Sequence, residues 1–244
     1  MPKFFVSKDK INDHLISLDS DNANHIANVL RAKVGDRIIV GDGEGMDYTC
    51  EIEDISKNEV RAKIVDITSS GAEPDIKLTL FQALPKSDKM ELVIQKCIEI
   101  GADSIVPVAT EHCVVSLKGK EDKKISRWNK IAEAAAKQCG RGKIPRVEPV
   151  LSFNEAIEKS KELDCAIIPY EKEDKNTLKS FCNSFKGKSI GIFIGPEGGF
   201  SRAEIDKAIE NNVVPVTLGK RILRTETAGL VACAILLYEL EDRL

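Results

Sequence analysis

From residue 76 onward, predicted buried strands alternate with predicted amphipathic helices, and this alternation limits the possible folds more than any other feature of the sequence. The strands are predicted over Ile76–Gln82, Ser104–Val108, Cys165–Pro169, Ser189–Ile194 and Val213–Leu218. The helices are predicted over Ser87–Ile100, Ser126–Cys139, Phe153–Leu163, a segment opened by Ser201 with Glu204 as its capping-box partner, and Thr225–Leu240. Parallel strands need such crossover connections, so the pattern predicts an α/β fold, a parallel sheet with helices on both faces.

The first 70 residues follow a different pattern. Short alternating or β-branched runs predict strands over Arg37–Val40, Tyr48–Ile55 and Val60–Ile67, with a glycine-rich turn between the first two. One helix is predicted over Asp21–Val29, capped by Ser20 or Asp21. A linker of small residues, Gly and Pro follows at 69–74. We therefore predict a small β-rich, barrel-like domain over residues 1–70 and an α/β domain over residues 71–244.

Composition excludes several classes of protein. No apolar run approaches the ~20 residues that cross a bilayer, and the N-terminus lacks the pattern of a signal peptide, so we expect a cytoplasmic protein without a membrane partner. The chain has seven cysteines, none spaced as Cys-x-x-Cys, and only three histidines. We therefore expect no metal site and no disulfide framework, with the cysteines acting as small buried apolar residues.

The distribution of charge is uneven. The net charge is −3, yet ten Lys and Arg residues between Lys118 and Arg146 face only three acidic residues. Residues 1–70 carry nine basic and thirteen acidic residues. A basic patch on an acidic protein is typical of a site that binds a polyanion such as RNA, although a solvated helix face gives the same pattern.

A glycine-rich loop follows one of the predicted buried strands. The strand Ser189–Ile194 runs into Gly195–Gly199, and a helix begins directly afterwards. Ligands of open α/β sheets bind at the carboxyl ends of strands, where glycines permit close approach to the backbone. The loop lacks the Lys of a phosphate-binding loop, and Glu197 at its centre would repel a phosphate. It therefore suits a ligand without a phosphate tail; a plain tight turn is the alternative.

A second polar segment, residues 217–228, also lies between a predicted strand and a predicted helix. It offers hydroxyl groups, two arginines, a carboxylate and a glycine. Because parallel strands end at one edge of their sheet, we expect this segment to lie near the glycine-rich loop. Thr225 as a helix cap and Glu226 as a partner of the helix dipole are structural roles that can coexist with function.

These segments resemble one family, the bacterial 16S rRNA uracil-specific methyltransferases of the RsmE type, which belong to the SPOUT superfamily. The C-terminal resemblance rests on Gly195-Pro196-Glu197-Gly198-Gly199 with Ser201 and Glu204, on Leu218-Gly219, and on Ile222 to Ala228. It continues upstream through Lys89-Met90-Glu91, Gln95 to Gly101, Arg127 to Ile131, Ala134-Ala135, Gln138 to Arg141 and Pro145, and in the first domain through His25, Val29 to Arg31 and Gly35-Asp36. The chain departs from the family at Lys3, where Arg is expected, and at Lys220, where Pro is usual. Lys at position 3 cannot form a bidentate contact.

The resemblance implies a PUA-like, barrel-type RNA-binding domain followed by a SPOUT domain with a C-terminal trefoil knot. It implies that the protein is a homodimer and uses S-adenosylmethionine to methylate ring nitrogen 3 of one uridine in the 16S rRNA of the small ribosomal subunit. The apolar last helix, residues 228–240, suits either a dimer face or a core helix.

The resemblance also implies which residues form the site. The cofactor would be held by Ile168, Pro169, Tyr170, Ile194, Gly195, Gly198, Gly199, Leu218, Gly219, Ile222, Leu223 and Thr227. Glu197 or Glu226, or a water held by one of them, would accept the imide proton, and Arg224 would stabilise negative charge on the uracil oxygens. Glu197 fixing the loop and Glu226 capping the helix are the alternatives. RNA phosphates would contact Lys3, Arg31, Lys96, Arg127, Lys130, Arg141, Lys143 and Arg146.

Three other functions compete with this interpretation. A methyltransferase of the same superfamily that acts on ribose hydroxyls would share the knot but should lack the upstream motifs. A non-enzymatic RNA-binding assembly factor would have no affinity for S-adenosylmethionine. A dinucleotide-dependent oxidoreductase is disfavoured by the missing Gly-x-Gly-x-x-Gly pattern.

Overall fold

The computed structural model describes residues 1–115, 117 and 119–241. The chain forms two compact units. The N-terminal unit comprises Met1–Glu73 together with a later segment, Ala136–Ile144, and the C-terminal unit comprises Pro74–Ala135 and Pro145–Leu244. Within the described residues, no helix is both long enough and apolar enough to span a membrane.

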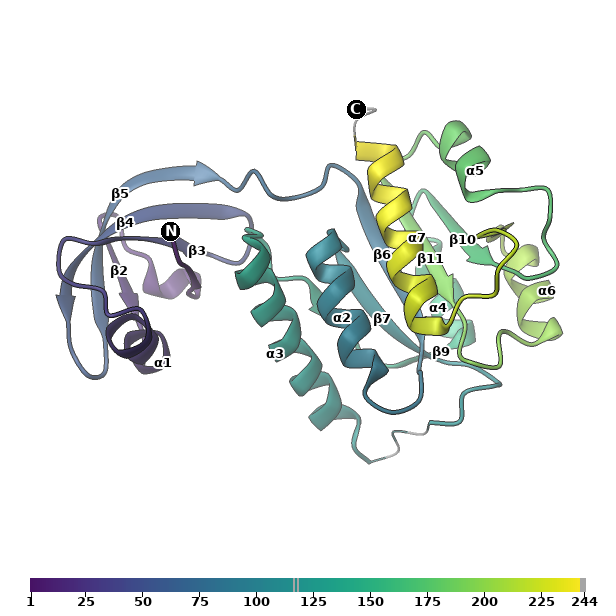
Figure 1. Ribbon diagram of the computed structural model, residues 1–244, viewed down its shortest axis with the longest axis horizontal. Coiled ribbons are helices and arrows are strands. Elements are labelled where there is room, and N and C mark those ends of the chain that lie inside the picture. The colour runs from purple at the N-terminus through teal and green to yellow at the C-terminus, as the bar shows by residue number, and fades with distance from the viewer. Residues whose placement is uncertain (116, 118, 242–244) are drawn as a thin grey trace. The chain divides into compact units, whose positions relative to one another are not determined.

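The N-terminal unit is built on a five-stranded sheet with the order β1-β3-β4-β5-β2 (Figure 1). Its strands are β1 (Lys3–Phe5), β2 (Leu15–Leu18), β3 (Arg37–Gly41), β4 (Met46–Ile55) and β5 (Val60–Ser69). β1 pairs with β3 in parallel, and the other neighbouring strands are antiparallel. The three strands predicted from sequence are confirmed, whereas β1 and β2 are too short for the pattern to indicate them.

One helical segment covers the core of this sheet. It consists of α1 (Ser20–Asn24) and a turn of π-helix, His25–Val29, so the predicted helical region is confirmed. The predicted cap is wrong: Asp19, in extended conformation, accepts a hydrogen bond from the Asn22 backbone N–H at 3.1 Å. A short 3-10 turn, Lys8–Lys10, lies between β1 and β2. The core beneath the helix consists of Phe4, Ile16, Leu18, Ala23, Ile26, Ile38, Val40, Cys50, Ile52, Val60 and Ala62.

The C-terminal unit contains the parallel sheet that the alternation predicts. Its strand order is β12-β10-β11-β6-β7-β8, with β9 also paired to β7, and every pair is parallel. The strands are β6 (Lys77–Ala83), β7 (Ser104–Ala109), β8 (Arg146–Val147), β9 (Leu151–Ser152), β10 (Cys165–Pro169), β11 (Ser189–Ile194) and β12 (Val214–Val216). β10 and β11 match their predicted bounds because each is a buried apolar run that ends sharply.

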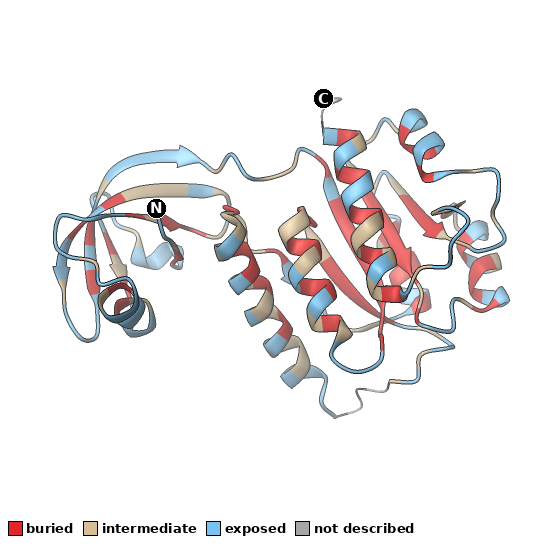
Figure 2. Cartoon of the chain, viewed as in Figure 1, coloured by how far each residue is buried: buried red, intermediate tan, exposed pale blue. Residues whose placement is uncertain are grey.

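Helices cover both faces of this sheet, as Figure 1 shows with α2 and α7 in front of the strands and α4 behind them. The helices are α2 (Lys89–Ile100), α3 (Glu121–Cys139), α4 (Phe153–Ser160), α5 (Leu178–Ser184), α6 (Arg202–Glu210) and α7 (Thr225–Leu240). α7 packs on α2, β6 and β11. α4 and α6 contribute Phe153 and Ile205 to a core that also holds the stacked rings of Phe81 and Phe193. Figure 2 shows buried residues along the strands and on one side of each helix.

Four helices of the C-terminal unit differ from the prediction, and α2 differs least, beginning at Lys89 rather than Ser87. α3 begins five residues earlier than expected, with Glu121 and Asp122 in its first turn, where acidic side chains favour the helix dipole. α4 ends at Ser160 rather than Leu163. α5 was not predicted, because its seven residues are too few for a clear period; the side chain of Thr177 caps it by accepting a hydrogen bond from the Ser180 backbone N–H.

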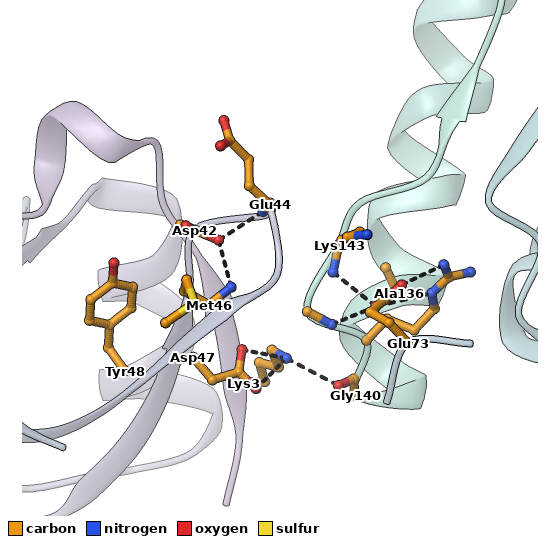
Figure 3. A network of polar contacts seen from close by, with 12 residues as sticks. Lys3, Asp42, Glu44, Met46, Asp47, Tyr48, Glu73, Ala136, Gly140 and Lys143 are labelled. Carbon is orange, nitrogen blue, oxygen red and sulfur yellow. Dashed lines mark hydrogen bonds and ion pairs between the residues drawn. The ribbon is translucent and has the colours of Figure 1, made fainter. Parts of the chain in front are cut away.

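The turn after α3 is tied into the N-terminal unit by polar contacts (Figure 3). The Glu73 carboxylate accepts hydrogen bonds from Arg141 Nη2 at 2.8 Å and from the backbone N–H groups of Gly142 and Lys143 at 2.9 and 3.0 Å. Lys3 Nζ lies 2.8 Å from Asp47 Oδ1 and donates to the Gly140 carbonyl at 3.1 Å. We call the group of Glu73, Arg141, Gly142 and Lys143 the Glu73 clasp. Only glycine fits at position 142, because an added Cβ would lie 2.1 Å from Ser70 Cβ.

Candidate functional site

A cavity of about 1010 Å³ lies at the carboxyl ends of β10, β11 and β12. These strands are neighbours in the parallel sheet, so the loops that follow them meet at one edge. Ten of the residues expected to hold a cofactor line the cavity: Pro169, Tyr170, Ile194, Gly195, Gly198, Gly199, Leu218, Gly219, Ile222 and Leu223. The other two do not line it: Ile168 is fully buried in the core, and Thr227 is exposed in the first turn of α7.

The glycine-rich loop is held in place by side chains from distant parts of the chain. The Thr225 hydroxyl donates to the Gly195 carbonyl at 2.6 Å. At the other end of the loop, His112 Nδ1 lies 3.1 Å from the carbonyl oxygens of both Gly198 and Gly199. Gly199 has φ +67°, a conformation that favours glycine. The loop is therefore a fixed wall of the cavity. It is a tight turn that also lines the candidate site, so the two interpretations of its sequence are compatible.

Lys89 joins two of the three residues expected to be catalytic. Its ammonium lies 3.0 Å from Glu197 Oε1 and 3.1 Å from Glu226 Oε2. The two carboxylates come from different segments, the glycine-rich loop and the first turn of α7. The Lys86 backbone N–H also donates to Glu197 at 3.2 Å. Lys89 lines the cavity and was not predicted as a site residue: it belongs to the family motif Lys89-Met90-Glu91, but nothing in the local sequence shows that its ammonium meets carboxylates from distant segments.

These contacts fix the charge states of the two carboxylates. Burial raises the pKa of Glu197, but its own backbone N–H, the Lys89 ammonium and the Lys86 N–H outweigh burial and lower it. The pKa of Glu226 is lowered mainly by its own backbone N–H, with Lys89 and Arg224 adding to the effect. The pKa of Lys89 is raised by Glu197 and then by Glu226. All three groups are ionised at neutral pH, and a lowered pKa makes each carboxylate a weaker base.

The cavity wall combines an apolar part with charges of both signs. Ile194, Leu218, Leu223 and Ala228 form part of its apolar surface, and Ile222 is 90% exposed beside them. The charged residues that line the cavity are Lys89, Glu171, Glu173, Asp174, Glu197, Lys220, Arg221 and Arg224. Acids and bases are balanced here, unlike in a phosphate cradle. Such a wall suits a ligand that carries an apolar ring together with both positive and negative charges.

The residues expected to contact RNA differ in exposure. Arg31, Arg127, Lys130 and Arg146 are exposed; Arg31 has φ +54°, and Arg127 Nη2 lies 2.7 Å from Glu91 Oε2. Lys96 is half-buried beside Glu99, and Lys143 is half-buried in the Glu73 clasp. Lys118, part of the basic run, lies outside the described residues.

Two of the expected RNA contacts are buried instead. Only 3% of the Arg141 side chain is exposed, and its guanidinium is bonded to Glu73. Only 6% of the Lys3 side chain is exposed, beside Asp47. This burial argues against a phosphate contact for either residue, because both cations already have carboxylate partners within their own unit.

The structure also bears on metal and sulfur chemistry. In the part of the chain that the structure describes, no three His, Cys, Asp or Glu side chains gather as they would around a metal ion. The seven cysteines are free thiols, of which Cys50, Cys97, Cys182 and Cys233 are buried. Burial raises the pKa of the Cys50 thiol to about 12, as for an inert core residue.

Comparison with known proteins identifies the family. Residues 72–237 match an RNA methyltransferase domain, and residues 18–65 match an RNA methyltransferase PUA domain. The chain is 36% identical to ribosomal RNA small subunit methyltransferase E of Bacillus subtilis (strain 168), over 99% of this chain and 98% of that protein. It is 32% identical to the protein of the same name from Buchnera aphidicola subsp. Acyrthosiphon pisum (strain APS), over 97% and 92% of the two chains.

Two solved structures of similar proteins contain S-adenosylmethionine. Ribosomal RNA small subunit methyltransferase E from Neisseria gonorrhoeae, bound to S-adenosyl methionine, is 30% identical with a TM-score of 0.89 and full coverage of both chains. The putative methyltransferase Lpg2936 from Legionella pneumophila, in complex with the same cofactor, is 30% identical with a TM-score of 0.84 and 96% coverage of each chain. The chain therefore belongs to the RNA methyltransferase family, among the ribosomal RNA small subunit methyltransferases E.

Proposed function

We propose that this protein transfers the methyl group of S-adenosylmethionine to ring nitrogen 3 of a uridine in the 16S rRNA of the small ribosomal subunit. The observation that carries the proposal is the cavity formed by the loops after β10, β11 and β12, which gathers ten of the residues expected for this cofactor. Because ribosomal subunits are assembled in the cytoplasm, we propose that the protein acts there.

The residues of the cavity fit S-adenosylmethionine. The cofactor has an adenine ring, a zwitterionic amino-acid group and a cationic sulfonium, and it carries no phosphate. Ile194, Leu218 and Leu223 offer apolar surface for the ring, and the acidic side chains that follow β10 suit the cationic groups. When bound, the cofactor supplies an electrophilic methyl group. The remaining task of the protein is to place the uracil nitrogen in line with it, which can remove ~7–11 kcal/mol of the barrier.

The imide nitrogen must lose its proton to become a good nucleophile. Arg224 lines the cavity and is exposed at the start of α7, where its guanidinium can stabilise the charge that spreads onto the uracil oxygens. Glu197 and Glu226 are weak bases because hydrogen bonds from their own backbone N–H groups, together with the ion pairs to Lys89, lower the pKa of both carboxylates. We infer that the proton passes through a water molecule held by one of these carboxylates to bulk solvent, and that the shared Lys89 keeps the glycine-rich loop and the first turn of α7 in register.

The SPOUT-type knot is also part of the proposal. It is supported by the contacts of Thr217 with the chain at the start of α5: the Thr217 backbone N–H donates to the Asn176 carbonyl at 2.9 Å, and the Leu178 N–H donates to the Thr217 carbonyl at 3.2 Å. The chain then enters α7, which packs on α5 as well as on the central strands.

A homodimer is likewise proposed, with α7 at the interface. In support, Ile235 and Tyr238 of α7 leave 38% and 81% of their surfaces exposed. Apolar side chains on one helix suit a surface that another copy covers.

RNA binding by this protein should depend strongly on salt. Arg31 in the N-terminal unit and Lys130 and Arg146 in the C-terminal unit are exposed cations that we propose neutralise phosphates. Each neutralised phosphate releases counterions, so affinity for a 16S rRNA fragment should fall by about one to two orders of magnitude between about 50 and 200 mM salt. Filter binding or fluorescence anisotropy would measure this, and an affinity that stays flat would remove the cations from the interface.

The function itself is tested by mapping methylated uridines in 16S rRNA from cells that lack the protein, with and without restoration of the gene. One unmethylated uridine that regains a base methyl group on restoration is the expected result. Methylation on ribose would favour the related class of ribose methyltransferases. Calorimetric titration with S-adenosylmethionine separates the remaining alternative, because an assembly factor would bind RNA without binding the cofactor.

A further inference from the structure

The amide side chain of Gln82 is buried behind the cavity. Gln82 is the penultimate residue of β6, in register with Ile194 of β11 on one side and Pro107 of β7 on the other. It is 0% exposed and does not line the cavity. Burying a polar amide is unfavourable unless it forms hydrogen bonds, so its place among apolar strands calls for a reason.

The hydrogen bonds of this amide lead to the wall of the cavity. Gln82 Nε2 donates to the Ala83 carbonyl at 3.0 Å and to Thr225 Oγ1 at 2.9 Å, which uses both of its hydrogens. Because Thr225 Oγ1 accepts there, its single hydrogen is directed to the Gly195 carbonyl at 2.6 Å. These two hydrogen bonds form a series with a fixed direction, from the Gln82 amide to the Thr225 hydroxyl to the Gly195 carbonyl. Such bonds strengthen one another in a low-dielectric interior.

Stability alone does not account for this side chain. Gln82 Oε1 is buried and has no hydrogen-bond partner among the described residues. It lies against Gly229 of α7, where an added Cβ would be 3.1 Å away. An unsatisfied buried acceptor is destabilising, whereas an apolar side chain of the same shape would avoid that cost. What an apolar residue could not provide is the hydrogen bond that Gln82 donates to Thr225.

We propose that Gln82 is a positioning residue of the cofactor site. Its amide orients the Thr225 hydroxyl, which in turn fixes the Gly195 peptide where the glycine-rich loop leaves β11. Gly195 and Thr225 both line the cavity, so the orientation of this peptide shapes the surface that the ligand meets. The inference rests on the proposed function, since the ligand used to test it is S-adenosylmethionine.

The experiment compares four variants by calorimetric titration with S-adenosylmethionine and by thermal unfolding. Gln82→Met keeps the length of the side chain and removes its donors; we expect the Kd to rise about tenfold, equal to about 1.4 kcal/mol. The melting temperature should stay the same or rise, because the unsatisfied acceptor is gone. Thr225→Val should weaken binding similarly, and Thr225→Ser, which keeps the hydroxyl, should restore binding close to the wild-type Kd.

The double variant Gln82→Met/Thr225→Val tests whether Gln82 acts on the cavity through Thr225. The two groups act one through the other, so we expect the double variant to bind no more weakly than the weaker single variant. A wild-type protein that does not bind S-adenosylmethionine would overturn the proposed function. If the wild type binds, a Gln82→Met variant whose Kd for S-adenosylmethionine is unchanged overturns the inference, whether or not its melting temperature falls. Losses of binding free energy that add in the double variant overturn it as well. If Gln82→Met does not fold, Thr225→Val binding as tightly as Thr225→Ser overturns it.

Discussion

Replacing Arg224 with alanine is expected to lower the single-turnover rate of methyl transfer by roughly two to three orders of magnitude, the usual loss when one preorganised group that stabilises developing charge is removed. The Kd for S-adenosylmethionine should change little, because the proposed contact of Arg224 is with the uracil. Rapid-quench assays with labelled cofactor at saturation would measure the rate, and calorimetry would measure the Kd.

Two comparisons make this result specific. Lys161→Ala also removes one exposed cation from the C-terminal unit, at a residue that does not line the cavity, and should leave the rate unchanged. Glu226→Gln keeps the shape of its side chain and loses one ion pair with Lys89. Near-normal single-turnover rates for both Arg224→Ala and Glu226→Gln would rule out catalytic roles for these two residues.

The largest expected effect on stability comes from Glu73→Gln. The substitution leaves the guanidinium of Arg141, which is only 3% exposed, without its carboxylate partner. Breaking a buried ion pair by removing one partner costs about 3 kcal/mol or more in the free energy of unfolding. Denaturant unfolding at neutral pH would measure the change. Glu53→Gln, at an exposed glutamate of β4 in the same unit, should stay within about 0.5 kcal/mol of the wild type.

The effect of Glu73→Gln should also depend on pH. Burial raises the pKa of Glu73, but Arg141 and the backbone N–H groups of Lys143 and Gly142 outweigh it, so the pKa lies below its ordinary value of 4.5. A carboxylate with a lowered pKa in the folded state contributes its stability above the ordinary pKa and loses it as the pH falls through the lowered one. The difference between wild type and variant should therefore be full at neutral pH and shrink below about pH 4. A difference that does not change with pH would contradict the ion-pair explanation.

The C-terminal sheet and the place of the cavity could be predicted because both depend on local patterns. Buried runs such as Ser189–Ile194 end abruptly at glycine or proline, so their bounds match the observed strands. The carboxyl ends of parallel strands share an edge, which predicts that the loops after β11 and β12 lie together; the loop after β10 was implied only by the family resemblance. The end of β6, where Gln82 lies, carries no comparable local signal.

The residues that sequence reasoning missed act through partners distant in the chain. Lys89 stands in the family motif Lys89-Met90-Glu91, but the motif does not show what its ammonium contacts, and only folding brings it between Glu197 and Glu226. Arg141 was expected to meet phosphate because its neighbours in sequence are basic. Its carboxylate partner, Glu73, precedes it by 68 residues, and no local pattern connects them. The sequence thus shows which side chains are charged, but not which oppositely charged side chain each of them pairs with in the fold.

The membership of residues 136–144 in the N-terminal unit has a consequence for synthesis on the ribosome. The strands of that unit are complete by Ser69, but the segment that closes the Glu73 clasp follows most of α3 in the chain. Translation proceeds from the N-terminus, so Glu73 and Lys3 lack their partners in residues 140–143 until β6, α2, β7 and α3 have been made. A fragment that stops at the linker would keep this incomplete state permanently. An attempt to express the N-terminal unit alone should therefore include residues 136–144, joined to the end of residues 1–73 through a short engineered linker.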